Sequence, residues 1–205
     1  GTTAECYDIA GDFAQKPLPE RSFAAPDWYR EWCFLRHPRM EQYGLTQGSA
    51  LLHGTEVTLD EPGSPTFIGL RQQDFSGTVQ CVLELDKGEA GLTCYMSEQE
   101  HYEVALRRGE TGITALCRLN IGGVHQIQKE IPLTGNSARL VIRMEPACYH
   151  FSVVTESGET HLGTGQSKYL SSEISSPFTG VIMGLYAVGD NTVRFTNFSC
   201  VYTET

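Results

Sequence analysis

The sequence predicts an all-β protein built as a sandwich of two antiparallel sheets, and three observations support this. Short runs rich in β-branched and aromatic residues recur from Asp27 onward. Many of these runs alternate apolar and polar residues, which is the period of a strand with one buried face. Turn residues separate the runs at intervals of roughly 8 to 12 residues, the spacing typical of a sandwich or barrel. Because hairpins need only short turns, an antiparallel sandwich is the simplest architecture that fits.

The composition is that of one acidic globular domain. The chain has 205 residues, with 15 Lys and Arg against 25 Asp and Glu, and a formal net charge of −10. A chain of this length can bury a core without the help of disulfides or metals. The negative charge argues against nucleic acid or an anionic membrane as a partner, since both need clustered cations. No run reaches the roughly 18 apolar residues that a membrane-spanning helix requires.

The chain divides into a lead-in and a sandwich. Residues 1–26 contain three prolines among polar residues, which indicates a linker or an extended first strand. Residues 27–205 form the predicted sandwich, with short helices expected only around residues 26–32 and 167–172. The predicted strands are residues 50–53, 66–70, 77–85, 91–96, 102–107, 113–119, 124–131, 138–144, 149–154, 181–188 and 193–202.

Alternation within these strands predicts which side chains face the core. Leu140, Ile142 and Met144 share one side of their strand, because successive side chains of a strand point to opposite faces. Turns such as Gly122-Gly123 and Gly189-Asp190 offer positions where the backbone can take a positive φ between strands.

The seven cysteines indicate free thiols. None forms a C-x-x-C pair, which gives no support to a zinc ribbon or a redox motif. Most lie inside apolar runs such as residues 79–83 and 115–119, where a cysteine acts as a small hydrophobic side chain. Free buried thiols fit a reducing compartment, so a cytoplasmic location is expected. The chain opens on Gly1 without an initiator Met, which suggests a cloning scar or an excised fragment.

Candidate catalytic carboxylates are few. Glu84 and Asp86 share a strand face, as acids do in some sandwich-fold glycosidases, but the next position on that face is Gly88. Glu98 and Glu100 also share a face, within a polar turn. Both pairs are interpreted as solvated groups at strand ends and turns. The sequence contains no phosphate-binding loop, nucleophile elbow or zinc-protease motif.

A second set of residues is of the kind that binds sugars. Arg71 and Gln73 follow one strand run on the same face, while Tyr95, His101 and Tyr102 lie on two runs joined by a short turn. Guanidinium groups, planar amides and aromatic faces suit the hydroxyls and C–H surfaces of carbohydrates. The alternative is a structural network, with Arg71 in an ion pair across the sheet and the tyrosine rings in the core.

An ordered set of segments, spread over about residues 28–202, resembles one known family. No single motif is diagnostic, but the ordered set is specific. The set includes Trp32-Cys33-Phe34-Leu35-Arg36-His37-Pro38, Pro65-Thr66-Phe67-Ile68-Gly69-Leu70-Arg71-Gln72-Gln73, Glu89-Ala90-Gly91-Leu92-Thr93-Cys94-Tyr95-Met96 and Tyr169-Leu170-Ser171-Ser172-Glu173. It resembles the C-terminal concanavalin A-like domain of glycoside hydrolase family 43 β-xylosidases and α-L-arabinofuranosidases.

This resemblance implies a jelly-roll sandwich that normally follows a catalytic β-propeller, which is missing from this chain. It implies that the loop 63–67 reaches toward the propeller's pocket, with Phe67 or a neighbour forming part of the pocket wall. It also implies a structural Ca²⁺ between an N-terminal acid, here Asp12, and an Asp near the last strand, where this chain instead has Asn197 with a neutral oxygen, completed by oxygens that the sequence does not locate. One departure is Leu70, where the family usually has an arginine, and this weakens any charged sugar contact there.

Three functional hypotheses follow. The first is a non-catalytic accessory domain that packs on the propeller and shapes its pocket for xylo- or arabino-oligosaccharides. The second is an autonomous carbohydrate-binding module for xylan- or arabinan-type sugars, with a concave sheet around Arg71, Gln73 and Tyr95. The third is a self-sufficient glycosidase that uses Glu84 and Asp86, which would require turnover of a xyloside or arabinoside by this chain alone.

Overall fold

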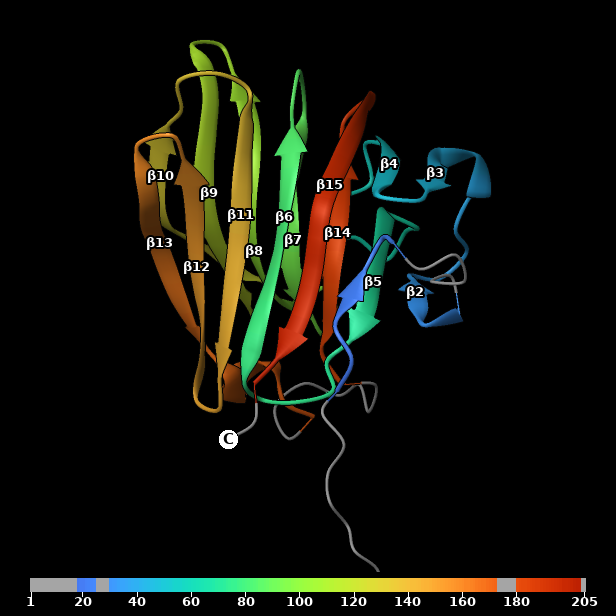
Figure 1. Cartoon of the computed structure of the whole chain (residues 1–205), viewed down its shortest axis with the longest axis vertical. Coiled ribbons are helices and arrows are strands. Elements are labelled where there is room, and N and C mark those ends of the chain that lie inside the picture. The colour runs from blue at the N-terminus through green and yellow to red at the C-terminus, as the bar shows by residue number, and fades with distance from the viewer. Residues whose placement is uncertain (1–17, 25–29, 173–179, 204–205) are drawn as a thin grey trace, which may run out of the picture.

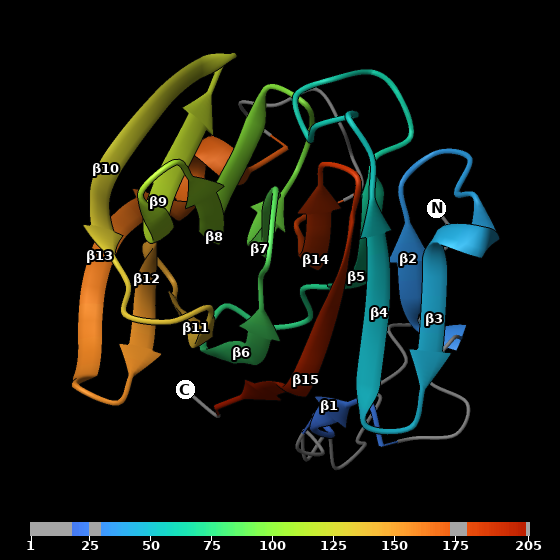
Figure 2. The ribbon, with the colours of Figure 1, turned by 90° about the horizontal axis from the view of Figure 1, so that it is seen from above.

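Two antiparallel sheets face each other across the core, one in front of the other in Figure 1 and seen end-on in Figure 2. A computed structural model describes residues 18–24, 30–172 and 180–203. These residues form strands, turns and short 3-10 helices, and they contain no α-helix. None of the helices in this part of the chain has the length and apolar character needed to span a membrane. The expected all-β sandwich is confirmed.

The first sheet has eight strands, in the order β13-β12-β11-β6-β15-β4-β3, with β1 paired to β15 beside this path. Its strands are β1 (Arg21–Ser22), β3 (Tyr43–Thr46), β4 (Ser49–Gly54), β6 (Gly77–Glu84), β11 (Ser137–Glu145), β12 (Cys148–Thr155), β13 (Gly158–Gln166) and β15 (Asn191–Tyr202). The second sheet has seven strands, in the order β10-β9-β8-β7-β14-β5-β2. Its strands are β2 (Trp32–Phe34), β5 (Thr66–Arg71), β7 (Glu89–Tyr95), β8 (Glu100–Gly109), β9 (Gly112–Ile121), β10 (Val124–Pro132) and β14 (Ile182–Val188).

All the predicted strands are present, and their ends lie within two residues of those predicted. The sequence pattern missed β2, β3 and β13, while β1 lies in the lead-in that was predicted to be a linker or an extended first strand. The strand β13 is rich in glycine and polar residues, which are depleted in strands, so its sequence does not stand out. The helix expected at 167–172 is a 3-10 helix, η3 (Ser167–Leu170). Residues 26–29 of the other expected helix lie outside the described residues, and its last residue, Trp32, begins β2.

The inner faces of both sheets pack against each other. Leu140, Ile142 and Met144, predicted to share a face, are all buried in this core. On β8, Tyr102 and Val104 face the same interior. Burying one large aliphatic side chain stabilises the fold by about 1.5–3 kcal/mol, so the core is the main source of stability.

A second apolar cluster lies on the outer face of the seven-stranded sheet. It contains Phe67, Tyr95 and Tyr186 from three neighbouring strands, together with Leu59 from the loop between β4 and β5. Figure 2 shows this loop arching beyond β5 and β14, on the side away from the first sheet. The loop therefore covers part of an outer sheet face that would otherwise expose aromatic rings to water.

Candidate functional site

The β4–β5 loop, residues 55–65, carries part of the segment that was expected to reach toward a catalytic pocket. Its Leu59 is 2% exposed and packs in the outer cluster with Phe67 and Tyr95. Phe67 is fully buried, and its ring lies 5.6 Å from the Tyr95 ring. In this structure the ring of Phe67 forms the floor beneath the loop, and it does not reach the outer surface.

Arg36 holds the same loop in place from its other side. Its Nη1 donates hydrogen bonds to the carbonyl oxygens of Gly63 at 2.6 Å and Glu61 at 3.3 Å, and its guanidinium forms an ion pair with Glu98. Arg36 also has a left-handed backbone, with φ of 53°, a strained conformation that clusters at functional positions. With the loop held in this way, Glu61 and Pro62 are exposed at its tip.

A shallow pocket of about 320 Å³ lies between this loop and the segment that links β2 to the 3-10 helix η2 (Met40–Gln42). The backbone N–H of His37 donates to Ser64 Oγ at 3.3 Å and joins the two walls. Met40 is 51% exposed, beside a lining residue. The pocket is lined by His37, Arg39, Gln42, Thr55, Val57 and Ser64.

His101 anchors the loop from beneath. It is 1% exposed, its ring stacks 5.7 Å from Tyr95, and its Nδ1 donates to the Ser97 carbonyl at 3.0 Å. Its Nε2 lies 3.3 Å from Oδ1 of Asp60 in the loop, and Asn120 Nδ2 donates to the same oxygen at 2.8 Å. His101 therefore acts as a buried partner of the loop and has no open face for a sugar.

The charges around Asp60 shift the pKa of both partners. Partial burial alone would raise the pKa of Asp60, but His101, His125 and Asn120 together lower it below its ordinary 3.8. Burial alone would lower the pKa of His101, but Asp60, Glu103 and a backbone carbonyl raise it above its ordinary 6.5. Both shifts favour the charged pair that holds the loop to the sheet.

An ion network continues from His101 across the outer face of the sheet. Arg118 donates from Nε to Glu103 Oε2 at 2.5 Å and from Nη2 to Glu89 Oε1 at 2.6 Å. Tyr186 donates its hydroxyl hydrogen to Glu89 Oε1 at 2.9 Å. Burial raises the pKa of Glu103, which is 2% exposed, while the charge of Arg118 opposes that rise. The carboxylates of Glu89 and Glu103 therefore take part in a structural network of ion pairs and hydrogen bonds.

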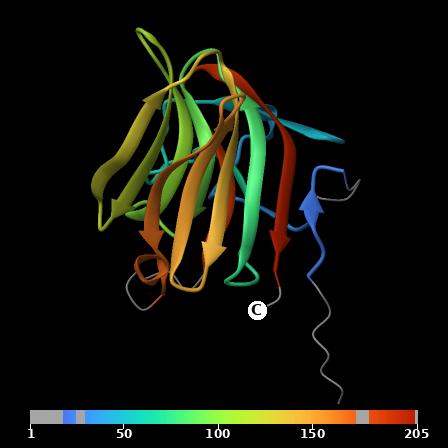
Figure 3. The same cartoon turned by 60° about the vertical axis from the view of Figure 1, so that its left-hand side comes forward.

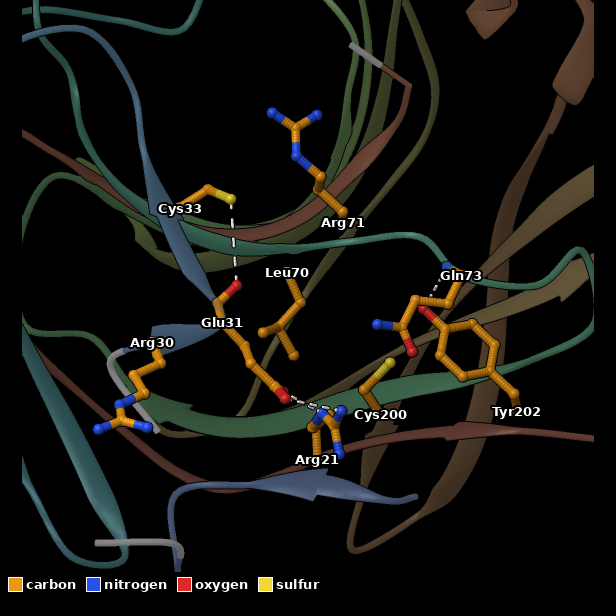
Figure 4. A pocket seen from close by; sticks show the side chains of 9 residues that line it. All are labelled: Arg21, Arg30, Glu31, Cys33, Leu70, Arg71, Gln73, Cys200 and Tyr202. Carbon is orange, nitrogen blue, oxygen red and sulfur yellow. Dashed lines mark hydrogen bonds and ion pairs between the residues drawn. The ribbon is translucent and has the colours of Figure 1, made fainter. Parts of the chain in front are cut away.

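Arg71 and Gln73 lie elsewhere, at a pocket of about 310 Å³ at the opposite end of β5 (Figure 4). Gln73 follows the end of β5, and its backbone N–H donates to the Tyr202 hydroxyl at 3.0 Å. In Figure 4 the Arg71 guanidinium points away from the ion pair of Arg21 and Glu31. The other lining residues are Arg30, Cys33, Leu70 and Cys200.

The structure therefore divides the residues predicted to bind sugar. Tyr102 is fully buried in the core, where its hydroxyl donates to the Gln166 carbonyl at 2.9 Å. Tyr95 is 4% exposed and does not line the pocket of Arg71 and Gln73. The strand register places Arg71 and Tyr95 on either side of Ile182, but Tyr95 is buried there and only Arg71 and Gln73 line the pocket. The burial of Tyr95 and Tyr102 fits the alternative interpretation, in which the tyrosine rings pack inside the fold.

The remaining candidates are a metal site and a carboxylate pair. Asp12 lies outside the described residues, so the calcium site stays a prediction. Asn197 is exposed and has φ of 48°, where the register of β15 shifts, a conformation that asparagine tolerates well. Glu84 and Asp86 each accept a hydrogen bond of 3.1 Å from Asn136 Nδ2, which ties them to a turn.

Comparison with known proteins identifies the fold family. The family model for the β-xylosidase C-terminal concanavalin A-like domain matches residues 20–200. The chain belongs to this family. It is 31% identical over 168 residues to the non-reducing end α-L-arabinofuranosidase BoGH43B of Bacteroides ovatus, which covers 78% of this chain but only 32% of that enzyme. The domain therefore spans about a third of that curated relative.

Solved structures of family 43 proteins contain the same fold. Bacteroides ovatus xyloglucan PUL GH43B superposes with a TM-score of 0.78 at 26% identity, over 93% of this chain and 40% of that one. The xylan β-1,4-xylosidase of Bacillus halodurans C-125 superposes with a TM-score of 0.81 at 22% identity, over 96% of this chain and 41% of that one. The expected concanavalin A-like sandwich is confirmed.

Sequence reasoning missed the residues that fix the β4–β5 loop in this family member. Asp60 precedes His101 by 41 residues, so no local pattern joins them. Arg36 lies inside one of the segments that carried the family resemblance, but its contacts with Glu61 and Gly63 depend on the fold. Arg118 lies within the apolar run 115–119, which was weighed only for its cysteine, and its partners Glu103 and Glu89 come from other strands.

Proposed function

We propose that the domain is the accessory sandwich of a family 43 glycosidase. It would pack on a catalytic propeller through the end that carries the β4–β5 loop and help shape the pocket for a hemicellulose oligosaccharide. The observation that carries this proposal is the double fixation of the loop by Asp60 and Arg36. A loop held in one conformation loses less entropy when it meets a partner, so it suits an interface.

The exposed groups near the loop suit a partner surface of mixed character. Met40 offers apolar area, Glu61 and Pro62 project at the loop tip, and His37 lines the neighbouring pocket. The carboxylates weighed for catalysis, in contrast, are tied to turns. This distribution supports a division in which the catalytic acids belong to the propeller and this domain supplies a wall.

A domain exchange tests the proposal. In the Bacteroides ovatus arabinofuranosidase, the matching segment is replaced by this chain, and hydrolysis of aryl arabinosides and xylosides is measured. Replacing Glu61 and Pro62 by Ala and Gly should change kcat/KM, because the loop tip would contact the pocket. The matched control is Glu156→Ala, in an exposed turn between β12 and β13. Equal kcat/KM for the loop variant and the unchanged chimera would overturn the pocket role.

Autonomous carbohydrate binding is a second candidate, and one observation favours it. Phe75 is 69% exposed beside a pocket of about 420 Å³ that is also lined by Gln72, Gln73, Tyr149 and Lys168. An exposed aromatic ring next to amide and hydroxyl groups can stack on a sugar ring and bind its hydroxyls.

Calorimetry separates this candidate from the first. Titration of this chain with xylo- and arabino-oligosaccharides should give measurable heat if the pocket binds sugar, and Phe75→Ala should abolish it. Val124→Ala is the matched control, since Val124 is 71% exposed on β10. An absence of heat with every oligosaccharide would reject autonomous binding and leave the accessory role standing.

A further inference from the structure

The hairpin of β11 and β12 brings three different metal-binding side chains together. This hairpin closes at the lower end of the sandwich in Figure 3. Cys148 Sγ lies 3.2 Å from His150 Nε2 and 3.8 Å from Glu145 Oε2, and His150 Nε2 lies 3.6 Å from the same oxygen. The three ligand atoms thus form a compact triangle at the surface of the first sheet.

The strand register explains why these side chains meet. Cys148 and His150 are two residues apart on β12, so they point to the same face of the sheet. Glu145 is paired directly with Cys148 across the hairpin, which places its carboxylate beside them. No local sequence motif joins the three residues, because Glu145 meets the other two only through the register of the two strands.

The size of the triangle matches a tetrahedral zinc site. Zinc bonds of about 2.3 Å to sulfur and about 2.0–2.1 Å to nitrogen and oxygen, at tetrahedral angles, separate neighbouring ligand atoms by about 3.3–3.6 Å. The observed separations of 3.2, 3.6 and 3.8 Å lie around that range. Thiolate, imidazole and carboxylate together suit zinc, whereas calcium requires several oxygen ligands.

A neighbouring strand orients the histidine of this triangle. His150 Nδ1 lies 3.1 Å from Thr164 Oγ1 on β13, and the same hydroxyl lies 3.2 Å from His161 Nε2. In the tautomer that carries its hydrogen on Nδ1, His150 donates to this hydroxyl and Nε2 keeps its lone pair for a metal. Thr164 is itself held in place, because its backbone N–H donates to Gln128 Oε1 on β10 at 2.7 Å. Such partners outside the ligand set fix the orientation and tautomer of metal-binding histidines.

We propose that Glu145, Cys148 and His150 form a binding site for one zinc-type divalent ion, with water at the fourth position. Cys148 and His150 are half-buried and Glu145 is exposed, so an ion can enter from solvent. Among the described residues, this is the one group of three His, Cys, Asp or Glu side chains close enough to share an ion. A bound ion would link β11 to β12 at the end of their hairpin.

Cobalt(II) substitution tests the site directly. The reduced chain is titrated with Co²⁺, and the near-ultraviolet charge-transfer absorption of a thiolate bound to cobalt is followed. One equivalent should saturate the signal, and Zn²⁺ should displace it. Cys148→Ser should abolish the absorption, while Cys33→Ser, at the other half-buried thiol of the described chain, should retain it. Absence of the band in the parent chain, or its persistence in Cys148→Ser, would overturn the proposal.

A second variant tests the orienting hydrogen bond. Thr164→Val keeps a β-branched side chain but removes the hydroxyl that faces His150. Loss of an orienting partner weakens metal affinity by about 10–100-fold, so the cobalt dissociation constant should rise by that factor while the thiolate band remains. An unchanged dissociation constant would show that His150 Nε2 does not bind the ion in the orientation described.

Discussion

At the scale of single residues, Gly184 makes room for the aromatic ring beneath the β4–β5 loop. A Cβ at this position would lie 2.0 Å from Cε2 of Phe67, on the neighbouring strand. Gly184→Ala should therefore destabilise the fold by about 1–3 kcal/mol through overpacking, measured by urea unfolding. Gly109→Ala is the control, because its nearest contact would be at 3.8 Å. Equal stability of the two variants would contradict this packing.

The pair of His101 and Asp60 should give the domain a pH-dependent stability. The raised pKa of His101 means that the contribution of its charged form is complete below pH 6.5 and is lost as pH rises through the raised value. The lowered pKa of Asp60 adds a contribution that is present above pH 3.8 and is lost as pH falls through the lowered value. The pair should therefore hold the loop best between these two pH values.

Urea unfolding across pH measures this effect. The free energy of unfolding should fall as pH rises above 6.5, and the fall should be smaller in Asp60→Asn, which removes the charged partner of His101. His53→Gln is a suitable control, since the ring of His53 is exposed near the end of β4 and pairs with exposed Asp190. A parent and an Asp60→Asn variant with the same slope above pH 6.5 would rule out the pair as the cause.

At the scale of elements, the contacts of Arg36 are one of the two attachments that hold the β4–β5 loop, the other being Asp60. Arg36→Ala should release the carbonyls of Gly63 and Glu61, so amide hydrogen exchange in residues 56–64 should accelerate while the strands stay protected. Arg39→Ala, in the same exposed segment, should leave the loop unchanged. Because Arg36 has a positive φ, Arg36→Gly should be more stable than Arg36→Ala, although both lose these contacts. If amide hydrogen exchange in the loop is unchanged in Arg36→Ala, Leu59 and Asp60 are sufficient to hold the loop.

Two arginines of the strands show how burial changes the value of an ion pair. Arg118 lies between Glu103 and Glu89 on the covered face, so Arg118→Met would leave buried Glu103 without its partner and destabilise the fold by about 3–5 kcal/mol. Arg143 pairs with Glu159 on the exposed face of the first sheet, and Arg143→Met should cost about 1 kcal/mol or less. Chemical denaturation of both variants checks the difference, and similar losses would refute the assigned role of burial.

At the scale of the whole molecule, the sequence could predict the strands but not how they meet. Period-2 alternation located the buried faces, as at Leu140 and Ile142, because that signal is local. The sequence did not reveal the strand β13, because the burial of this strand depends on its neighbours more than on its own residues. The loop anchor and the β11–β12 triangle both depend on pairing between strands. Tyr102 could not be assigned to the core or the surface until its register was known.

The buried thiols allow the cooperativity of the whole sandwich to be measured. They come from both sheets: Cys81 and Cys200 from the first, and Cys94 and Cys117 from the second. Burial raises the pKa of Cys117 to about 12, and a buried thiol is also closed to reagents, so reaction with a disulfide reagent requires opening of the sandwich. If both sheets unfold as one unit around their shared core, the four thiols should react at one rate in dilute urea, and the opening free energy should equal that of global unfolding. The half-buried Cys33 and Cys148 should react without denaturant and serve as the internal reference. Faster reaction of the second sheet's thiols would show that the sheet beneath the β4–β5 loop opens separately, and would count against a single cooperative unit.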